Sequence, residues 1–216
     1  MISELTRTWT HGWTVSRRTP PPVERPWGLS IEVGAEGHML RHVVPSAEGD
    51  AIRAAAEAAP GPDAWLKIPA EPREVWPFLP PGWVVVEEDP GHLMAADLCE
   101  TGPAAPEGYA ASVEVCDGVT FVVVRDAAGE RAARGQAAVV GEAAIVDQVV
   151  TEEAHRRRGL GAFVMRTLAD RAVAEGAVLG ILGATDAGRA LYETLGWKAH
   201  AGLTGCTRRA QPGGSS

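Results

Sequence analysis

Three consecutive arginines, Arg156–Arg158, run directly into Gly159-Leu160-Gly161, and an apolar segment with helical spacing follows. If this stretch joins a strand to a helix, the first helical amides have no partner within the helix and lie at the positive end of its dipole. Glycines let the backbone approach an anion there, and arginines add forked donors for phosphate oxygens. The combination suits a diphosphate, although a bare arginine run can equally be a solvated face.

The surrounding pattern places this arginine-glycine loop between a strand and a helix. Residues 111–126 predict two strands joined by an Asp117-Gly118 turn, and residues 132–140 and 143–150 predict two more. After the loop, apolar spacing predicts a helix from Leu160 to a stop near Gly176, and then a buried strand over 177–184. A second helix capped by Asp186 and a last strand over 197–206 complete this half.

The first half repeats the same order in shortened form. Residues 28–46 predict strand, glycine turn and strand, residues 47–59 a helix, and residues 64–69 a short strand. Both halves then reach a Gly-Trp pair after a short helical stretch. We interpret this as an internal duplication, although any alternation of helices and strands can produce a similar period.

The segment Arg156–Gly161 reads R-x-x-G-x-G and resembles the Q/R-x-x-G-x-G/A loop of the GCN5-related N-acetyltransferase (GNAT) family. The later segment LYETLGW is similar to the tyrosine helix of that family. The resemblance covers about residues 109–206 and implies an α/β GNAT fold, a mixed and mostly antiparallel sheet with flanking helices. With the duplication, it predicts a tandem arrangement: a degenerate GNAT-like domain over 1–98 and an acetyltransferase domain over 109–210, joined by a Pro/Gly-rich linker.

The resemblance implies acetyl-CoA as co-substrate and no metal. The loop amides would hold the pyrophosphate, and the sheet would splay between the strands over 143–150 and 177–184, where the end of the first strand pairs with the pantetheine arm. Thr185 stands where many members have Asn. The residues implied to bind acetyl-CoA are Val149, Val150, Thr151, Arg156, Arg157, Arg158, Gly159, Leu160, Gly161, Ala162, Thr185 and Tyr192.

Acetyl transfer to an amine also requires an acid for the leaving thiolate, and the resemblance makes Tyr192 the candidate. Leu191 and Leu195 are expected on the core face of its helix, with Tyr192 turned about 100° away from Leu191. The alternative is a tyrosine that serves only packing.

Asp147 and Glu142 are the candidate bases, and each has the alternative of a structural or exposed carboxylate. Strand alternation predicts that Asp147, Val149 and Thr151 share one face. His155 adjoins the loop and is expected to be a packing residue there.

The acceptor cleft is expected between the halves. The family places helices between its first two strands, but here only Cys116–Val119 separate them, so the other half would supply the missing wall. In that half Pro45–Gly49 replaces the loop and Phe78 stands near the position of Tyr192, so we expect it to bind no CoA. Its tryptophans are expected either in the core or along the cleft: Trp9, Trp13, Trp27, Trp65, Trp76 and Trp83.

The composition of the chain limits the classes of partner that we expect it to bind. A net charge of −8 argues against a general nucleic-acid binder and only weakly favours cationic partners. No stretch approaches the ~20 apolar residues of a membrane helix, and the first residues lack a signal-peptide pattern. Cys99, Cys116 and Cys206 are expected as small buried side chains in a reducing, cytoplasmic setting.

The sequence thus predicts acetyl-CoA-dependent acetylation of a primary amine, with a small molecule as acceptor and a homodimer left open. The alternatives are acetylation of a protein or peptide amine, a longer acyl donor, and a non-catalytic acyl-CoA-binding sensor or assembly subunit.

Overall fold

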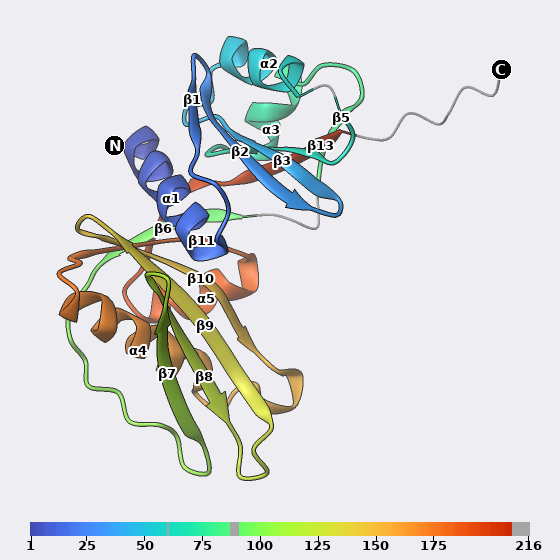
Figure 1. The fold of residues 1–216 in the computed structure, drawn as a ribbon. Coiled ribbons are helices and arrows are strands. Elements are labelled where there is room, and N and C mark those ends of the chain that lie inside the picture. The colour runs from blue at the N-terminus through green and yellow to red at the C-terminus, as the bar shows by residue number, and fades with distance from the viewer. Residues whose placement is uncertain (60, 87–90, 209–216) are drawn as a thin grey trace.

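The computed structural model describes residues 1–59, 61–86 and 91–208, and in this part of the chain two mixed sheets lie on either side of helix α1 (Ile2–Arg17) (Figure 1). The first sheet has the order β1-β2-β3-β4-β13-β5 and the second has the order β12-β6-β11-β10-β9-β8-β7. The strands of the first sheet are β1 (Val23–Arg25), β2 (Gly28–Ala35), β3 (His38–Val43), β4 (Ala64–Ile68), β13 (Thr204–Arg208) and β5 (Trp83–Val85). Those of the second are β12 (Lys198–Gly202), β6 (His92–Asp97), β11 (Leu179–Ala184), β10 (Ala143–Thr151), β9 (Arg131–Val140), β8 (Val119–Arg125) and β7 (Ala110–Cys116).

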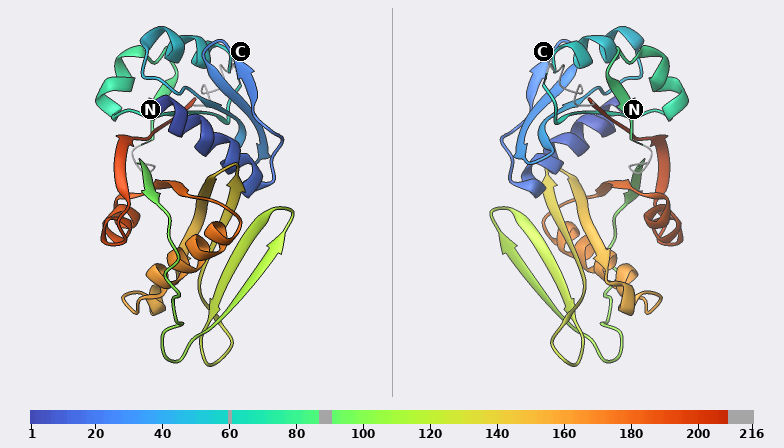
Figure 2. Two further views of the ribbon diagram at one scale, coloured as in Figure 1. Left: turned by 90° about the vertical axis from the view of Figure 1, so that its left-hand side faces the viewer. Right: turned by 90° about the vertical axis from the view of Figure 1, so that its right-hand side faces the viewer.

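Helices cover the outer face of each sheet, as the two side views show (Figure 2). The first sheet carries α2 (Gly49–Glu57), α3 (Pro72–Val75) and the 3₁₀ turn η1 (Trp76–Phe78). The second carries the 3₁₀ turn η2 (Glu153–His155), α4 (Leu160–Ala174) and α5 (Asp186–Thr194). This confirms the predicted α/β class with mixed, mostly antiparallel sheets and flanking helices.

Both sheets are built in the same order. An antiparallel pair (β2–β3 or β9–β10) leads into a helix (α2 or α4), which returns the chain to a parallel strand (β4 or β11). A second short helical segment then leads to an edge strand (β5 or β12). In each sheet, the strand between the parallel strand and this edge strand comes from elsewhere in the chain.

That inserted strand is exchanged between the sheets. β6 lies between β11 and β12, and β13 lies between β4 and β5. The amide of Leu203, just before β13, donates to the carbonyl of Gly91, just before β6, over 2.7 Å. Each of the expected ranges, 1–98 and 109–210, therefore contributes one strand to the sheet built mainly from the other.

Several local predictions are confirmed, including the β7–β8 hairpin, whose Asp117 and Gly118 have φ of 51° and 74°. Helix α4 ends beside Gly176, whose φ is 94°. The predicted single strand over 197–206 is wrong: the chain crosses between the sheets at Leu203 and forms two strands, β12 and β13. Asp186 is not the cap of α5, because Thr185 holds that position and accepts from the amide of Gly188.

Helix α1 was not predicted, and it fills the space between the sheets. Trp9 and Trp13 are buried with Ile145 and Ile181 of the second sheet and Leu29 of the first. The buried threonines of α1 satisfy their hydroxyls on carbonyls one turn back, as Thr10 does on Thr6 over 2.7 Å. The helix therefore stabilises both sheets at once through a shared apolar core.

The expectation that the cysteines are buried is confirmed for one of the three. Cys206 is buried on β13, but Cys99 and Cys116 are exposed. Cys99 follows β6 in the connection to β7, and Cys116 lies at the tip of the β7–β8 hairpin, so neither has a core to enter. Within the described ranges, no helix is long and apolar enough to cross a membrane.

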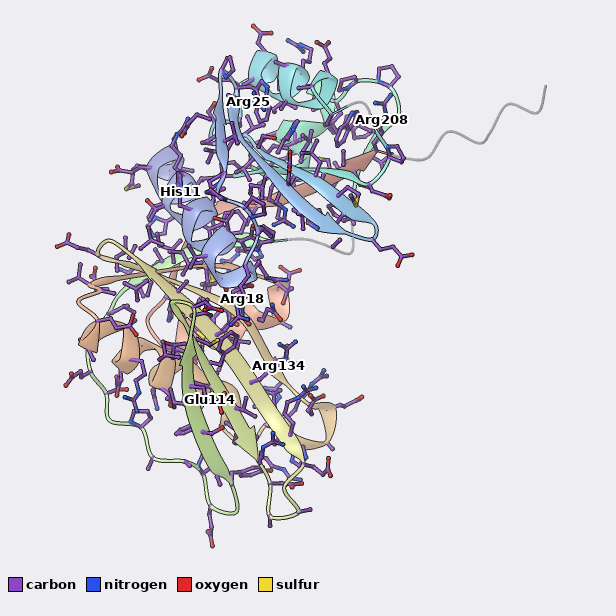
Figure 3. All side chains as sticks on the ribbon, in the orientation of Figure 1. His11, Arg18, Arg25, Glu114, Arg134 and Arg208 are labelled. Atoms are coloured by element: carbon purple, nitrogen blue, oxygen red, sulfur yellow. The ribbon has the colours of Figure 1, made fainter. Side chains whose placement is uncertain are left out.

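Gly12 sets how closely α1 approaches β10, because a Cβ there would lie 2.4 Å from Cγ1 of Ile145. We expect Gly12→Val to lower the free energy of unfolding by about 1–3 kcal/mol, as overpacking of a tight core does. The matched control is His11→Val, which places the same side chain on the exposed face of the same helix (Figure 3). Urea denaturation of both variants checks this, and equal stabilities would contradict the packing described here.

Candidate active site

Strands β10 and β11 part in the middle of the second sheet. Their parallel pairing covers only Ala143–Ile145 with Leu179–Ile181, although both strands continue beyond it. The register of β10 with β9 also shifts between Asp147 and Val150, and Gln148 adopts a positive φ of 53°. A cavity of about 190 Å³ opens at the parting. The predicted splay between these two strands is confirmed.

The bulge corrects the predicted alternation along β10. Asp147 points to the α1 side, where it meets Arg17, whereas Val149 points to the α4 side, where it packs near Gly135 and the apolar core. The predicted common face of Asp147 and Val149 is wrong, because the bulge adds a residue to the strand and shifts its alternation from that point.

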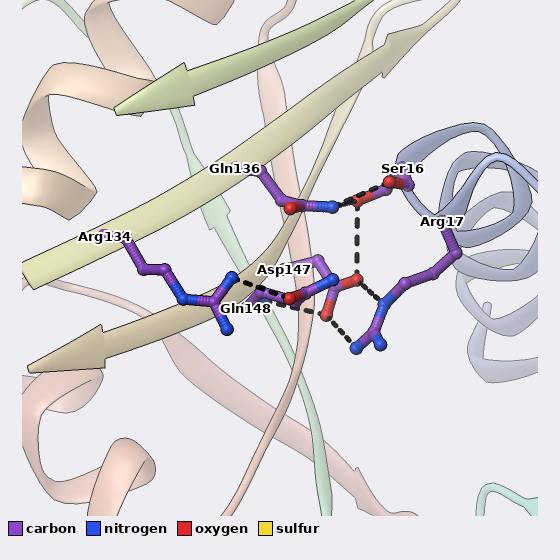
Figure 4. Close-up of polar contacts among 6 residues, drawn as sticks. All are labelled: Ser16, Arg17, Arg134, Gln136, Asp147 and Gln148. Atoms are coloured by element: carbon purple, nitrogen blue, oxygen red, sulfur yellow. Dashed lines mark hydrogen bonds and ion pairs between the residues drawn. The ribbon is translucent and has the colours of Figure 1, made fainter. Parts of the chain in front are cut away.

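Polar contacts fix the bulge and tie it to the end of α1 (Figure 4). Arg17 binds Asp147 with both Nε and Nη2, the latter 3.0 Å from Oδ1, and the amide of Gln148 donates to the same Oδ1 over 2.9 Å. Gln136 donates to the carbonyl and hydroxyl oxygens of Ser16. The side chain of Asp147 is 15% exposed, so its carboxylate is held at the wall of the cavity rather than in bulk solvent.

Tyr192 lies at the other side of the parting. It lines the same cavity as Asp147 and is 8% exposed, deeper than the half-buried Leu191 and Leu195 beside which it packs. Tyr192 was predicted to point away from the core, and this is wrong, because its side chain is buried. The apolar core of this sheet extends as far as the cavity. Burial, with a smaller contribution from Asp147, raises the pKa of the Tyr192 hydroxyl to about 12, so it stays protonated at neutral pH.

Thr185 caps helix α5 as well as lining the cavity. As the cap of α5, its Oγ1 accepts from the Gly188 amide over 3.2 Å. This cap fixes the start of the helix that carries Tyr192.

The arginine-glycine loop leads from β10 into α4 through η2. Arg157 and Gly159 have positive φ of 61° and 78°, and Gly159 caps α4 without a side chain. The three arginines are exposed; Arg158 donates to the hydroxyl of Tyr109, which also contacts Nδ1 of His155 over 3.0 Å. His155 thus orders the loop, as expected of a packing residue.

This loop fits the pyrophosphate of an acyl-CoA. The first-turn amides of α4, from Leu160 to Ala162, receive no side-chain cap, and a Cβ on Gly159 would meet only open space. Gly161 has a different role, since a Cβ there would lie 2.8 Å from Leu191, so this glycine permits the contact between α4 and α5.

Glu142 does not join the group at the parting. It lies in the β9–β10 turn, where its carbonyl accepts from the amides of Val178 and Leu179. Its side chain lines a separate cavity of about 820 Å³ near the start of α1. Glu142 precedes β10, whereas Asp147 lies at the middle of that strand, and of the two only Asp147 lines the cavity that Tyr192 lines. In the described part of the chain, no cluster of three or more metal-ligating side chains occurs.

A second cavity, of about 160 Å³, adjoins the first between the two sheets. The two cavities share Arg17, Asp147, Gly183, Ala184 and Thr185. The other residues that line the second are Leu203 and five residues from the first 91 positions of the chain: Trp9, Trp13, Arg41, Lys67 and Gly91. Sequence reasoning missed Arg17, Arg41 and Lys67, and the four-residue spacing of Leu5, Trp9 and Trp13 was the signal that could have found α1.

The first sheet contains no corresponding parting within its described strands. Pairing of β3 with β4 continues to Val43 and Lys67 at the end of β3, and the amide of Val44 adds a bond to the Lys67 carbonyl. Phe78 packs directly on Gly49 at the start of α2, where a Cβ would lie 2.4 Å from the ring. Its ring occupies the space next to the first turn of that helix.

Comparison with known proteins agrees with this geometry. The chain resembles the structures of a GCN5-related N-acetyltransferase from Kribbella flavida (TM-score 0.66, 18% identity, 99% of this chain and 96% of that one) and a GNAT-family acetyltransferase from Novosphingobium aromaticivorans (0.60, 21%, 96% and 99%). It also resembles a tandem GNAT protein from the clavulanic acid biosynthesis pathway (0.53, 13%, 76% and 69%). No curated protein matches the chain. The model of the acetyltransferase (GNAT) family matches residues 74–197, and the chain therefore belongs to this family of N-acetyltransferases.

Proposed function

We propose that this protein transfers the acetyl group of acetyl-CoA to the primary amine of a small molecule. The observation that carries the proposal is the meeting of two cavities at Asp147. One lies between the parted strands, and the other lies between the sheets. A thioester in the first would face an amine in the second.

The donor is held by backbone more than by side chains. Amides at the start of α4 and the exposed arginines receive the pyrophosphate, since a helix N-terminus and forked donors both favour phosphate. The pantetheine arm pairs with β10 beyond Ile145, where that strand no longer pairs with β11. Acetyl-CoA supplies the electrophilic thioester carbon.

The transfer needs three proton movements. The acceptor ammonium first loses a proton to Asp147, directly or through water, which gives the neutral amine. The amine nitrogen then attacks the thioester carbon and loses its second proton to solvent. The C–S bond breaks, and the leaving thiolate takes the proton of the Tyr192 hydroxyl, which solvent then restores. Arg17 positions that carboxylate at the junction of the cavities.

A small acceptor is favoured because the second cavity, which α1 and the first sheet border, is compact. Its volume of about 160 Å³ is below the ~300–1,000 Å³ of pockets for drug-sized ligands. The first sheet is a degenerate GNAT copy in this proposal, supported by its matching strand order and the absence of a parting among its described strands. It shapes the acceptor site and binds no CoA.

We therefore expect one acetyl-CoA per chain by titration calorimetry and a rise in melting temperature, since a ligand selective for the folded state stabilises it. The variant Arg157→Glu/Arg158→Glu should lose most of this affinity, because it reverses two exposed charges at the phosphate site. Arg53→Glu, an exposed change on α2, is the control. Two equivalent sites, or no binding at all, would contradict the proposal.

Tyr192→Phe should lower kcat by on the order of 10²–10⁴-fold while the affinity for acetyl-CoA stays the same, since the hydroxyl acts only as the thiolate leaves. The ring and its packing on Trp197 remain, so the fold should survive. Thiol release in an acceptor screen measures turnover. A Phe variant within about twofold of the wild type would make Tyr192 a packing residue.

Asp147→Asn should lower kcat/KM for the acceptor by about tenfold or more, because it removes the charge that attracts the ammonium and accepts its proton. Glu142→Gln, in the turn before the same strand, should stay within about twofold. One assay thus distinguishes which of the two candidate carboxylates acts on the acceptor. The reverse order of effects would place the acceptor in the large cavity near Glu142.

A further inference from the structure

We propose that Tyr109 and His155 are positioning residues for the donor: they hold the Arg158 guanidinium beside the start of α4, where it meets the pyrophosphate of acetyl-CoA. The inference rests on the proposed function and assigns a role to two residues outside the R-x-x-G-x-G segment. Arg158 directly precedes Gly159, which caps α4. A cation fixed at this point lies next to the first-turn amides of that helix.

The contacts of Arg158 form a hydrogen-bond chain with one direction. Its Nη1 donates to the Tyr109 hydroxyl oxygen over 3.0 Å, and that hydroxyl lies 3.0 Å from Nδ1 of His155. Because a guanidinium can only donate, the hydroxyl accepts from Arg158 and has its own proton left for Nδ1. The neutral imidazole then carries its proton on Nε2, which faces Oδ2 of Asp126 at 3.8 Å. The orientation of the hydroxyl therefore depends on His155.

The second sheet anchors the residues that hold the hydroxyl. The ring of Tyr109 is partly buried against the apolar core under α4. It meets the His155 ring edge to face, with centroids 5.7 Å apart and planes at 82°. Asp126 lies in the β8–β9 turn, which it closes by accepting from the Glu130 amide over 2.9 Å. The arginine-glycine loop is thus tied to two other segments of the sheet, the β8–β9 turn and the start of β7.

This restraint prepares Arg158 for a phosphate. The side chain of His155 is 17% exposed, whereas Arg158 is exposed, so the holding group lies inside and the binding group at the surface. A guanidinium has five donors, and the bond to Tyr109 uses one of them. The fork keeps donors for phosphate oxygens, and part of its rotamer entropy is lost before the ligand arrives. Arg156 is held differently, since its Nε lies 3.4 Å from the Thr151 carbonyl at the end of β10.

The test measures the dissociation constant of CoA by titration calorimetry and needs no acceptor. Tyr109→Phe keeps the ring, and we expect it to raise the constant about three- to tenfold, because Arg158 must then be immobilised on binding. Arg158→Gln should raise it by about tenfold or more, since it removes charged hydrogen bonds. In the Arg158→Gln background, Tyr109→Phe should add less than about 1.5-fold, because no guanidinium is left to hold.

A conservative pair of variants tests His155. His155→Asn should bind CoA within about twofold of the wild type, because an amide oxygen can replace Nδ1 as the acceptor. His155→Leu should weaken binding as Tyr109→Phe does. The matched control is Thr167→Val, which removes a hydroxyl bonded to the Phe163 carbonyl within α4 and should leave the affinity unchanged. Melting temperatures without ligand check that each variant folds.

A Tyr109→Phe variant that binds CoA as tightly as the wild type would overturn the inference and leave the proposed function intact. Equal losses from Tyr109→Phe with and without Arg158 would also contradict it, because the hydroxyl would then act on the ligand or on the fold by itself. Equal weakening by His155→Asn and His155→Leu would remove the role of His155. If the wild type binds no CoA, the proposed function itself fails.

Discussion

The parting of β10 from β11 is the constraint on which the rest of the site depends. Parallel pairing ends at Ile145, so the backbone beyond it has an unpaired edge that a ligand can extend as a strand would. The bulge at Gln148 bends the same strand and sends Asp147 towards α1, while Val146 and Val149 remain in the core under α4. The parting thus leaves a cavity between the strands, and the bulge places a carboxylate at its wall.

The exchange of β6 and β13 also shapes the cavity between the sheets that we propose for the acceptor. Each strand is the neighbour of a parallel strand, β11 or β4, in the sheet of the other half, so the two sheets cannot separate without breaking both. The crossing points at Gly91 and Leu203 are bonded to each other and line the acceptor cavity.

What the sequence revealed was local. The β7–β8 turn, helix α4 and the loop before it are set by residues within a few positions of one another, and all were predictable. The exchanged strands and the partner surface of α1 depend on contacts more than eighty positions apart, such as Ser16 with Gln136, which periodicity cannot reveal. The bulge was hidden because Gln148, rather than a glycine, adopts the positive φ. Without the bulge, Asp147 and Glu142 were equivalent candidates.

Net charge was a poor guide to partners for a related reason. The chain carries −8, which weakly favours cationic ligands, yet the acetyl-CoA that the family uses is a polyanion. Among the described residues, three of the four charged side chains that line the cavity between the sheets are basic. Screening limits the reach of an exposed charge to about 8–10 Å at physiological ionic strength, so distant carboxylates have little effect at the site. Inside a cavity the nearest groups dominate. Folding brings together charged side chains from three separate elements, Arg17, Arg41 and Lys67. The local potential in the cavity depends on these positions, which the net charge of the chain does not describe.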